Sequence, residues 1–302
     1  MQKAVYLMFL ILFPLSVFSQ KTKQEKDTNK GFELFFNAGM YWGSKYNANF
    51  YRGDPDPIDR DYADPDMGYV LGNSYLKQEV WRLIYDKHHN DIIDTFFNFE
   101  GMSNMKYNLA FSFGIGLRYR FSESFTLSFL FSQVGLTASG LATFGTQGRG
   151  ANLDKGIQYF DYPIMGKERR IFFEINASYL FETVHPSIFP FVELGVHVNN
   201  VKVLKCELIV EDVPFSMINM YGAGTYYDPS IAQPVINPYL GGVGFGFVGG
   251  FGVRFAFNKW AALEPVIQVS TEKLHLSSYG KMRPNYNLMI RLVVGDKVFR
   301  KW

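Results

Sequence analysis

The chain has 302 residues and a formal net charge of +2, with 30 Lys and Arg against 28 Asp and Glu. A charge balance this mild excludes a broad electrostatic surface for nucleic acid, and a single cysteine, Cys206, excludes an intrachain disulfide. With 18% aromatic residues, 28 glycines and no long apolar segment after the N-terminus, the composition excludes a helical membrane protein and is typical of a β-barrel wall.

The first 19 residues have the pattern of a cleavable secretory signal. Lys3 precedes the apolar segment AVYLMFLILFPLSVF, and Val17 and Ser19 occupy the small-residue positions of a cleavage site. An N-terminal membrane anchor is the alternative, but the segment is shorter than the ~20 residues that a membrane span needs. We therefore expect a mature chain that begins near Gln20, with residues 20–31 as a polar periplasmic tail.

Eight segments alternate large apolar residues with small or polar ones. A strand has a side-chain period of two, so each segment has one apolar face and one polar face. In a transmembrane barrel the apolar faces meet lipid and the polar faces fill the lumen, through strands of ~9–11 residues. The segments predict an all-β, antiparallel up-and-down transmembrane barrel of about eight strands, comprising residues 32–40, 107–121, 125–131, 170–181, 192–199, 243–257, 263–270 and 288–295.

The connections between these segments alternate in length. Long connections at about 42–106, 139–168, 200–239 and 277–285 alternate with the short turns SESF, TVHPSIF and NKW. A barrel with a periplasmic N-terminus has long extracellular loops and short periplasmic turns in this order. In a soluble β-sandwich nothing requires long and short connections to alternate. The alternation therefore predicts a barrel domain over residues 32–302.

This order of elements resembles a known superfamily. A signal, eight alternating strands, long loops and a terminal segment with Val298, Phe299 and Trp302 resemble the small outer-membrane β-barrels of the OmpX, OmpW and OmpA-barrel type. The stretches LAFSFGIGLRYRF and GGVGFGFVGGFGVRFAF are similar in style to the PorT-like group, barrels associated with gliding and protein secretion. The resemblance covers nearly the whole mature chain and implies surroundings of outer-membrane lipid and lipopolysaccharide. It is architectural and carries over no functional residue.

Charged residues interrupt the inward faces near the short turns. Arg118, Arg120 and Arg254 precede turns, whereas Glu193 and Glu264 follow them. Charges in a narrow lumen are costly unless they are paired, and the arginine fork pairs well with carboxylates. We predict an Arg/Glu network that closes the barrel floor, with an unpaired, hydrated lumen as the alternative.

The first long loop, at about 42–106, has two notable segments. After a cap at Asn73 or Ser74, a helix is predicted with its apolar stripe at helical spacing. The stripe comprises Leu76, Val80, Leu83, Ile84 and the stem of Lys87. Six aspartates within 54–66 supply hard oxygens for calcium, but prolines break the spacing, and a solvated turn-rich stretch is favoured. No metal or cofactor site is predicted elsewhere.

Large apolar residues in the outer loops predict either a packed lid or a partner interface. We expect a protein partner in the envelope. The candidate contact residues are Trp81, Phe96, Phe97, Phe99, Met217 and Tyr221.

One segment has an enzyme-like pattern. In KLHLSSYGKMRPN, His275 and Ser277 resemble the His-x-Ser pair of PagL-like lipid A deacylases. Ser278 stands where that motif carries asparagine, and the last strand offers no acid to orient His275. We predict a non-enzymatic accessory, structural or interaction protein, in one version a subunit of a protein-secretion or envelope-assembly complex. A lipid A deacylase and a small-solute channel are the alternatives.

Overall fold

A computed structural model describes residues 31–53, 64–88, 95–148, 156–185, 187–218, 240–258, 261–276 and 279–295. The predicted signal at 1–19 and most of the tail at 20–31 lie outside this part of the chain, as do Tyr221, Ser277, the aspartates at 54–61 and the terminal aromatic residues.

Eight long strands form a closed barrel. Each pairs antiparallel with its neighbours, and the pairing of β1 with β11 completes the circuit β5-β4-β1-β11-β10-β9-β7-β6 through a β5–β6 contact. The predicted eight-stranded up-and-down transmembrane barrel is confirmed. The strands are β1 (Gly31–Trp42), β4 (Ala110–Arg120), β5 (Phe125–Gly148), β6 (Ile157–Leu180), β7 (Ile188–Val210), β9 (Gly241–Ala256), β10 (Ala261–Lys273) and β11 (Arg283–Gly295).

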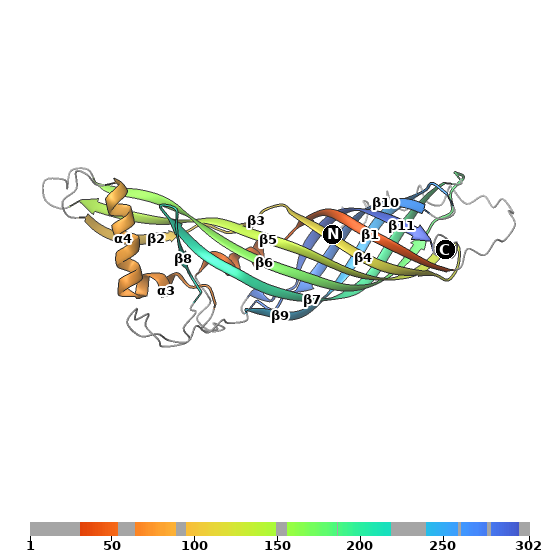
Figure 1. Cartoon of the computed structure of the whole chain (residues 1–302), viewed down its shortest axis with the longest axis horizontal. Coiled ribbons are helices and arrows are strands. Elements are labelled where there is room, and N and C mark those ends of the chain that lie inside the picture. Colours follow the sequence, from red (N-terminus) through yellow and green to blue (C-terminus); the bar gives the residue numbers. More distant parts are fainter. Residues whose placement is uncertain are drawn as a thin grey trace, which may run out of the picture.

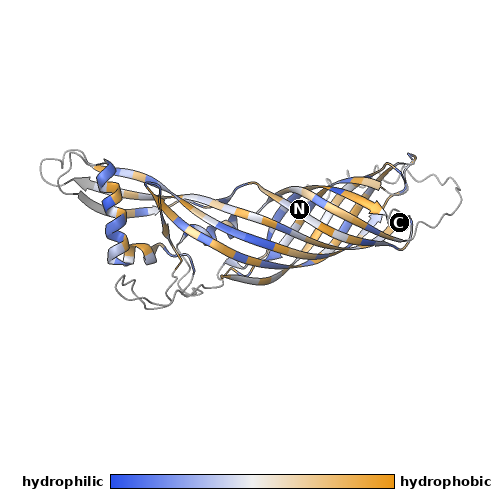
Figure 2. Ribbon diagram, in the orientation of Figure 1, coloured by the Kyte–Doolittle hydropathy of each residue, from blue (hydrophilic) through white to orange (hydrophobic). Residues whose placement is uncertain are grey.

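The strand register aligns apolar residues into a belt around the outside of the barrel. Phe36 of β1 lies opposite Ile115, Ile115 opposite Phe131, and Phe131 opposite Phe173. These outward side chains are exposed or half-buried, while alternate residues point inward, and orange bands alternate with blue along the barrel strands (Figure 2). Such a belt is the lipid-facing surface of a membrane-spanning barrel.

Three strands are much longer than a membrane span. β5 and β6 have 24 residues each and β7 has 23, which at ~3.3 Å per residue is roughly 75–80 Å, against an apolar band of ~25 Å. Most of residues 139–168 and the first part of 200–239 are therefore strand, and were wrongly assigned to loops. The alternation pattern does not show this, because beyond the belt the inward positions become apolar and the outward positions become polar, as at Ala138 and Ser139.

The extended strands form the floor of a folded cap, which occupies one end of the molecule (Figure 1). β2 (Thr95–Met102), β3 (Lys106–Tyr107) and β8 (Val213–Ser216) add to them, giving the local order β2-β5-β6-β7-β8. A two-residue turn joins β7 to β8, with Glu211 and Asp212 both at positive φ, as a type I′ hairpin requires. The helical elements are α2 (Lys45–Ala48), the 3-10 turn η2 (Asn49–Arg52), α3 (Met67–Gly72) and α4 (Ser74–His88).

Helix α4 forms where the sequence predicts it. Asn73 caps it, because its side-chain oxygen accepts hydrogen bonds from the Tyr75 and Leu76 amides at 3.0 and 3.2 Å. Val80 and Ile84 are fully buried in the cap. The predicted apolar stripe thus packs within the protein, and an ion pair between Lys87 and Glu211 joins the end of α4 to the β7–β8 turn.

In the described part of the chain, no helix is both long enough and apolar enough to cross a membrane.

Candidate functional site

The barrel lumen contains an ion-pair network near the short turns. Arg118 binds Glu264 through two hydrogen bonds of 2.7 and 2.9 Å, and both side chains are almost fully buried. Arg254 bridges Glu264, at 3.2 Å, and Glu33, at 3.0 and 2.8 Å. Because Arg254 on β9 reaches carboxylates on β10 and on β1, the network links strands that are not neighbours in the sheet. We call this set the turn-side network.

Two further arginines belong to the turn-side network. Arg120 donates to Glu33 at 2.8 Å. Arg291 donates to Glu193 at 3.0 and 3.4 Å and to Glu264 at 3.3 Å. The structure therefore brings together all five predicted lumen charges and adds Glu33 and Arg291, which sequence reasoning did not include. Strand parity places both additional residues inward, so the alternation already contained the signal.

Apolar and aromatic groups fill the space around these charges. Phe35 is fully buried, and the guanidinium carbons of Arg118 and Arg291 lie 5.3 and 4.9 Å from the centre of its ring. Phe35 packs in one layer with Leu130 and Val293. An eight-stranded barrel is narrow enough for its own side chains to fill it, and these layers leave no wide passage at this level.

A second network lies where the barrel meets the cap. Arg170 is fully buried and donates to Glu168, to Glu272 at 2.8 Å, and to the hydroxyls of Tyr41 and Tyr107 at 3.2 and 3.1 Å. Tyr41 in turn donates to Glu272 at 2.7 Å. We call this set the cap-side network, and sequence analysis did not anticipate it.

The 3-10 turn η2 closes the cap-side network from above. The Tyr51 hydroxyl donates to Glu168, and Tyr51 is itself fully buried. Burial, together with the charge of Glu168, raises the pKa of Tyr51 well above its usual value. The tyrosine therefore stays a neutral donor and holds the cap on the end of the lumen.

A small polar chamber separates the two networks. It is lined on one side by Glu174 and His197 and on the other by Ser112, Gln268 and Asn287. Glu174 and His197 are both almost fully buried. The lumen is thus closed at two levels with a polar cavity between them.

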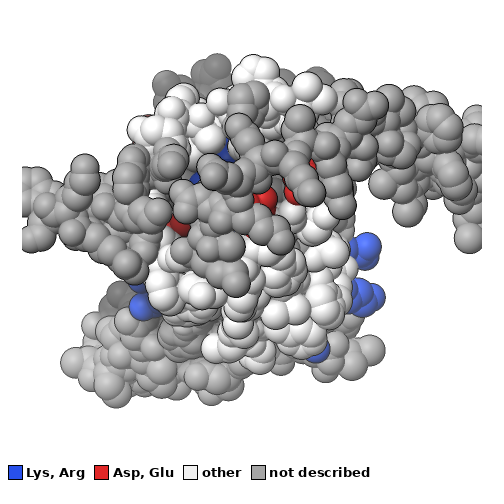
Figure 3. All heavy atoms as spheres, turned by 90° about the vertical axis from the view of Figure 1, so that its right-hand side faces the viewer, with Lys and Arg blue, Asp and Glu red and all other residues white. Residues whose placement is uncertain are grey.

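The end of the barrel with the short turns shows how the charges are placed. Figure 3 views this end, and the acidic side chains in view lie toward the middle of the face, inside a wall of mostly uncharged side chains. Inside the barrel, Glu33 pairs with Arg120 and Arg254.

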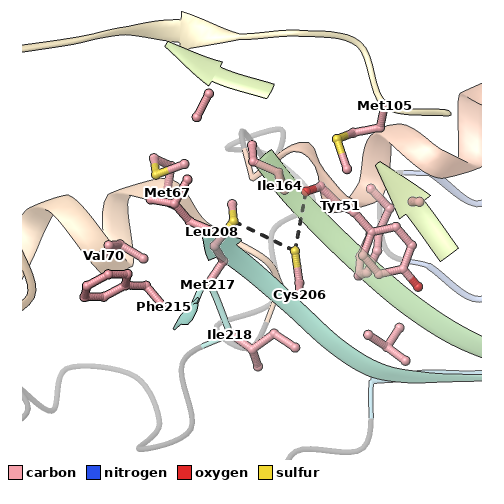
Figure 4. Close-up of a cluster of buried hydrophobic side chains, with 14 of the residues drawn as sticks. Tyr51, Met67, Val70, Met105, Ile164, Cys206, Leu208, Phe215, Met217 and Ile218 are labelled. Carbon is pink, nitrogen blue, oxygen red and sulfur yellow. Dashed lines mark hydrogen bonds between the residues drawn. The ribbon is translucent and has the colours of Figure 1, made fainter. Parts of the chain in front are cut away.

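The cap has a separate hydrophobic core around Cys206. Cys206 is fully buried, with its sulfur 3.4 Å from the Tyr51 carbonyl oxygen and 3.9 Å from the Met217 sulfur (Figure 4). Burial raises the pKa of the Cys206 thiol. The Cys206 thiol is therefore protonated and unreactive inside the cap, and it does not lie on an exposed loop.

The predicted contact residues separate into three groups. Trp81 is half-buried on α4 and stacks on Tyr85, with ring centres 5.5 Å apart. Phe99 packs against Phe144, and Met217 is fully buried beside Cys206. Met217 therefore belongs to a packed lid, the first of the two predicted arrangements, and is not available to a partner. Phe96 and Phe97 pair through their backbones with β5.

The enzyme-like residues are only partly described. His275 is exposed just beyond the end of β10. Its proposed partner Ser277 lies outside the described residues, so no catalytic geometry is defined there.

No protein-family model matches the chain, and no curated protein sequence matches it. Among solved structures, Neisserial surface protein A is 10% identical, with a TM-score of 0.38 and coverage of 87% of this chain and 96% of that one. The outer membrane protein OprG from Pseudomonas aeruginosa is 8% identical, with a TM-score of 0.31 and coverage of 88% and 94%. Ail, the attachment invasion locus protein of Yersinia pestis, is 10% identical, with a TM-score of 0.31 and coverage of 88% and 97%. The barrel assignment itself rests on the strand pairings and apolar belt of this chain.

Proposed function

We propose that this chain is an outer-membrane barrel that acts through its cap, on the extracellular side, as a non-enzymatic accessory or interaction protein. The observation that carries the proposal is the cap itself. Three strands continue far beyond the apolar belt and support a layer of helices with its own buried core. A rigid platform of this kind presents a fixed surface, which reduces the entropy lost when a partner binds.

The closed lumen argues against the channel alternative. The turn-side network and the cap-side network each place a fully buried arginine across the lumen, Arg291 in the first and Arg170 in the second. A solute would have to break buried ion pairs at both levels to pass. A subunit of a protein-secretion or envelope-assembly complex does not need an open lumen. Membership of such a complex is one form of the proposed role.

The aromatic pair on α4 is the proposed contact point. Trp81 and Tyr85 are half-buried and stack on each other, and aromatic residues of this kind are enriched where partners contribute most binding energy. Lys77 and Gln78 lie on the same helix and are exposed. They offer a matched control for any substitution on its surface.

The test is affinity purification of the tagged protein from its native envelope in mild detergent, followed by mass spectrometry of the proteins and lipids recovered. We expect a stoichiometric protein partner that is reduced at least tenfold by the double variant Trp81→Ser and Tyr85→Ser, by analogy with other aromatic contact sites. The control variant Lys77→Ser and Gln78→Ser should retain the partner. Recovery of the protein alone would overturn the proposal, and lipid A with trimmed acyl chains would favour the deacylase instead.

A further inference from the structure

The charges in the lumen do not balance. The carboxylates number six and the guanidinium groups five among the charged side chains that line the described barrel interior. The carboxylates belong to Glu33, Glu168, Glu174, Glu193, Glu264 and Glu272. The guanidinium groups belong to Arg118, Arg120, Arg170, Arg254 and Arg291. With all eleven of these groups ionised, one negative charge remains in a space where an uncompensated charge is strongly unfavourable.

The excess charge is located at Glu174, in the chamber. Asn176 and Gln268 each donate an amide hydrogen bond of 3.2 Å to the same oxygen, Oε2. The other oxygen, Oε1, accepts no hydrogen bond from the described residues, and none of their Lys or Arg side chains forms an ion pair with Glu174. Every other lumen carboxylate has an arginine partner.

A second polar group in the chamber also lacks satisfied hydrogen bonds. His197 is 3% exposed, and neither ring nitrogen has a hydrogen-bond partner among the described residues. Its Nε2 lies 3.6 Å from Glu272, beyond hydrogen-bond distance, and its ring meets Phe172 edge-on. The strand glycine Gly246 leaves room for the ring, because a Cβ there would lie 2.6 Å from Nε2.

The remaining lining is rich in neutral oxygen atoms. The lining side chains of Ser112, Ser132 and Ser270 carry hydroxyls, and those of Gln268 and Asn287 carry amide oxygens, of which the Asn287 oxygen accepts a hydrogen bond of 3.2 Å from the Ser112 hydroxyl. Carboxylate, carbonyl and hydroxyl oxygens are the ligands that hard cations prefer. A divalent ion typically takes several charged ligands, whereas this chamber offers one unpaired carboxylate.

We propose that the chamber between the two networks binds one small monovalent cation, such as Na⁺ or K⁺, beside Glu174. The cation neutralises the excess carboxylate and uses the surrounding hydroxyl and amide oxygens as further ligands. The site is independent of the proposed interaction of the cap with a partner. It makes the closed lumen a cation-dependent structure.

Thermal unfolding of the full-length protein in detergent tests the site. Chloride salts of Na⁺, K⁺ and Rb⁺ are compared at constant ionic strength with that of N-methyl-D-glucamine, which is too large for the chamber. We expect a saturable increase in Tm of roughly 5 °C with the small cations. The variant Glu174→Gln should lose this dependence, and the control Glu182→Gln, which removes an exposed carboxylate beyond β6, should keep it.

Crystals of the wild-type protein grown in RbCl give a second readout that does not depend on any variant folding. An anomalous peak beside Glu174 is the expected result. The proposal is overturned if no peak is found and Tm is the same with every cation. It is also overturned if Tm responds to the substitution His197→Gln but not to the cation, which would make His197 rather than a bound ion the balancing charge.

Discussion

The lumen and the cap share three strands, β5, β6 and β7, but their interiors have opposite chemistry. Inside the barrel, β6 contributes Arg170, Glu174 and Asn176, which are buried among other polar groups. Further along, the same inward face contributes Ile164 to an apolar core beneath α4. The outward face changes in the reverse direction, from Phe173 in the belt to Lys167 beyond it.

The change follows from the surroundings of each region. In lipid, apolar residues must face outward, so the inside of the barrel receives the polar groups and must pair its charges. In water the usual arrangement returns, and the helices of the cap bury their apolar stripe against the sheet. The boundary lies near Arg170 and Glu168, where the cap-side network joins the two environments.

The largest effect is expected from breaking the turn-side network. Glu264→Gln removes the charge that Arg118, Arg254 and Arg291 share. It should lower the free energy of unfolding by about 3–5 kcal/mol, because buried guanidinium groups lose their partner. Urea titration of the protein in lipid vesicles measures the change. Glu123→Gln, in the exposed turn after β4, is the control, and an equal loss there would contradict the structural role of the network.

The second effect should be confined to the cap. Ile84→Ala removes a fully buried side chain from α4 and should destabilise the packing of the helix by about 3 kcal/mol. Proteolysis and hydrogen exchange should then increase in 74–88 while the barrel strands remain protected. If hydrogen exchange in the barrel strands increases to the same extent, the cap and the barrel unfold as one cooperative unit. That result would contradict their description as two separate regions.

A smaller effect is expected at the start of α4. Asn73→Ala removes both side-chain hydrogen bonds to the first turn and should cost about 1 kcal/mol of cap stability. Asn73→Ser, which retains a capping oxygen, should restore most of it. Hydrogen exchange of the amides of Tyr75 and Leu76 directly measures the loss of these two hydrogen bonds at the start of α4.

Thiol labelling distinguishes the interior of the cap from its surface. Because Cys206 is buried and its pKa is raised, we expect it to react with a maleimide at least tenfold more slowly than a surface thiol. The comparison is Ser74→Cys in a Cys206→Ser background, since Ser74 is exposed. Equal rates would place Cys206 at the surface.

The sequence was informative where one periodic pattern decides the structure. Alternation predicted the barrel and the inward direction of Arg118, Arg254 and Glu264, and helical spacing with Asn73 predicted α4. It failed at the boundary between regions. Outward-facing apolar residues identify only strands that face lipid. The pattern therefore predicts loop at residues 139–148 and 157–168, where the strands have a polar outer face.

The sequence did not predict every member of the two networks, for a different reason. Arg170 lies on the polar face at the start of a predicted strand, but the predicted charge network includes only residues near the short turns. Glu168 lies at the end of a predicted loop, where strand parity gives no direction for its side chain. Parity shows that Arg291 points inward, but its partner Glu193 is on a non-adjacent strand. Which residues meet across a lumen depends on strand register and barrel width, which the alternation pattern does not contain.

Conductance across a planar bilayer tests the closure of the lumen at two levels most directly. The wild-type protein should not conduct, and neither should Arg170→Ala or the double variant Arg118→Ala and Arg291→Ala, because each leaves one network intact. The triple variant should conduct, with circular dichroism confirming that it retains its strands. Channels in the wild-type protein, or in a variant that lacks only one network, would contradict a lumen closed at two levels.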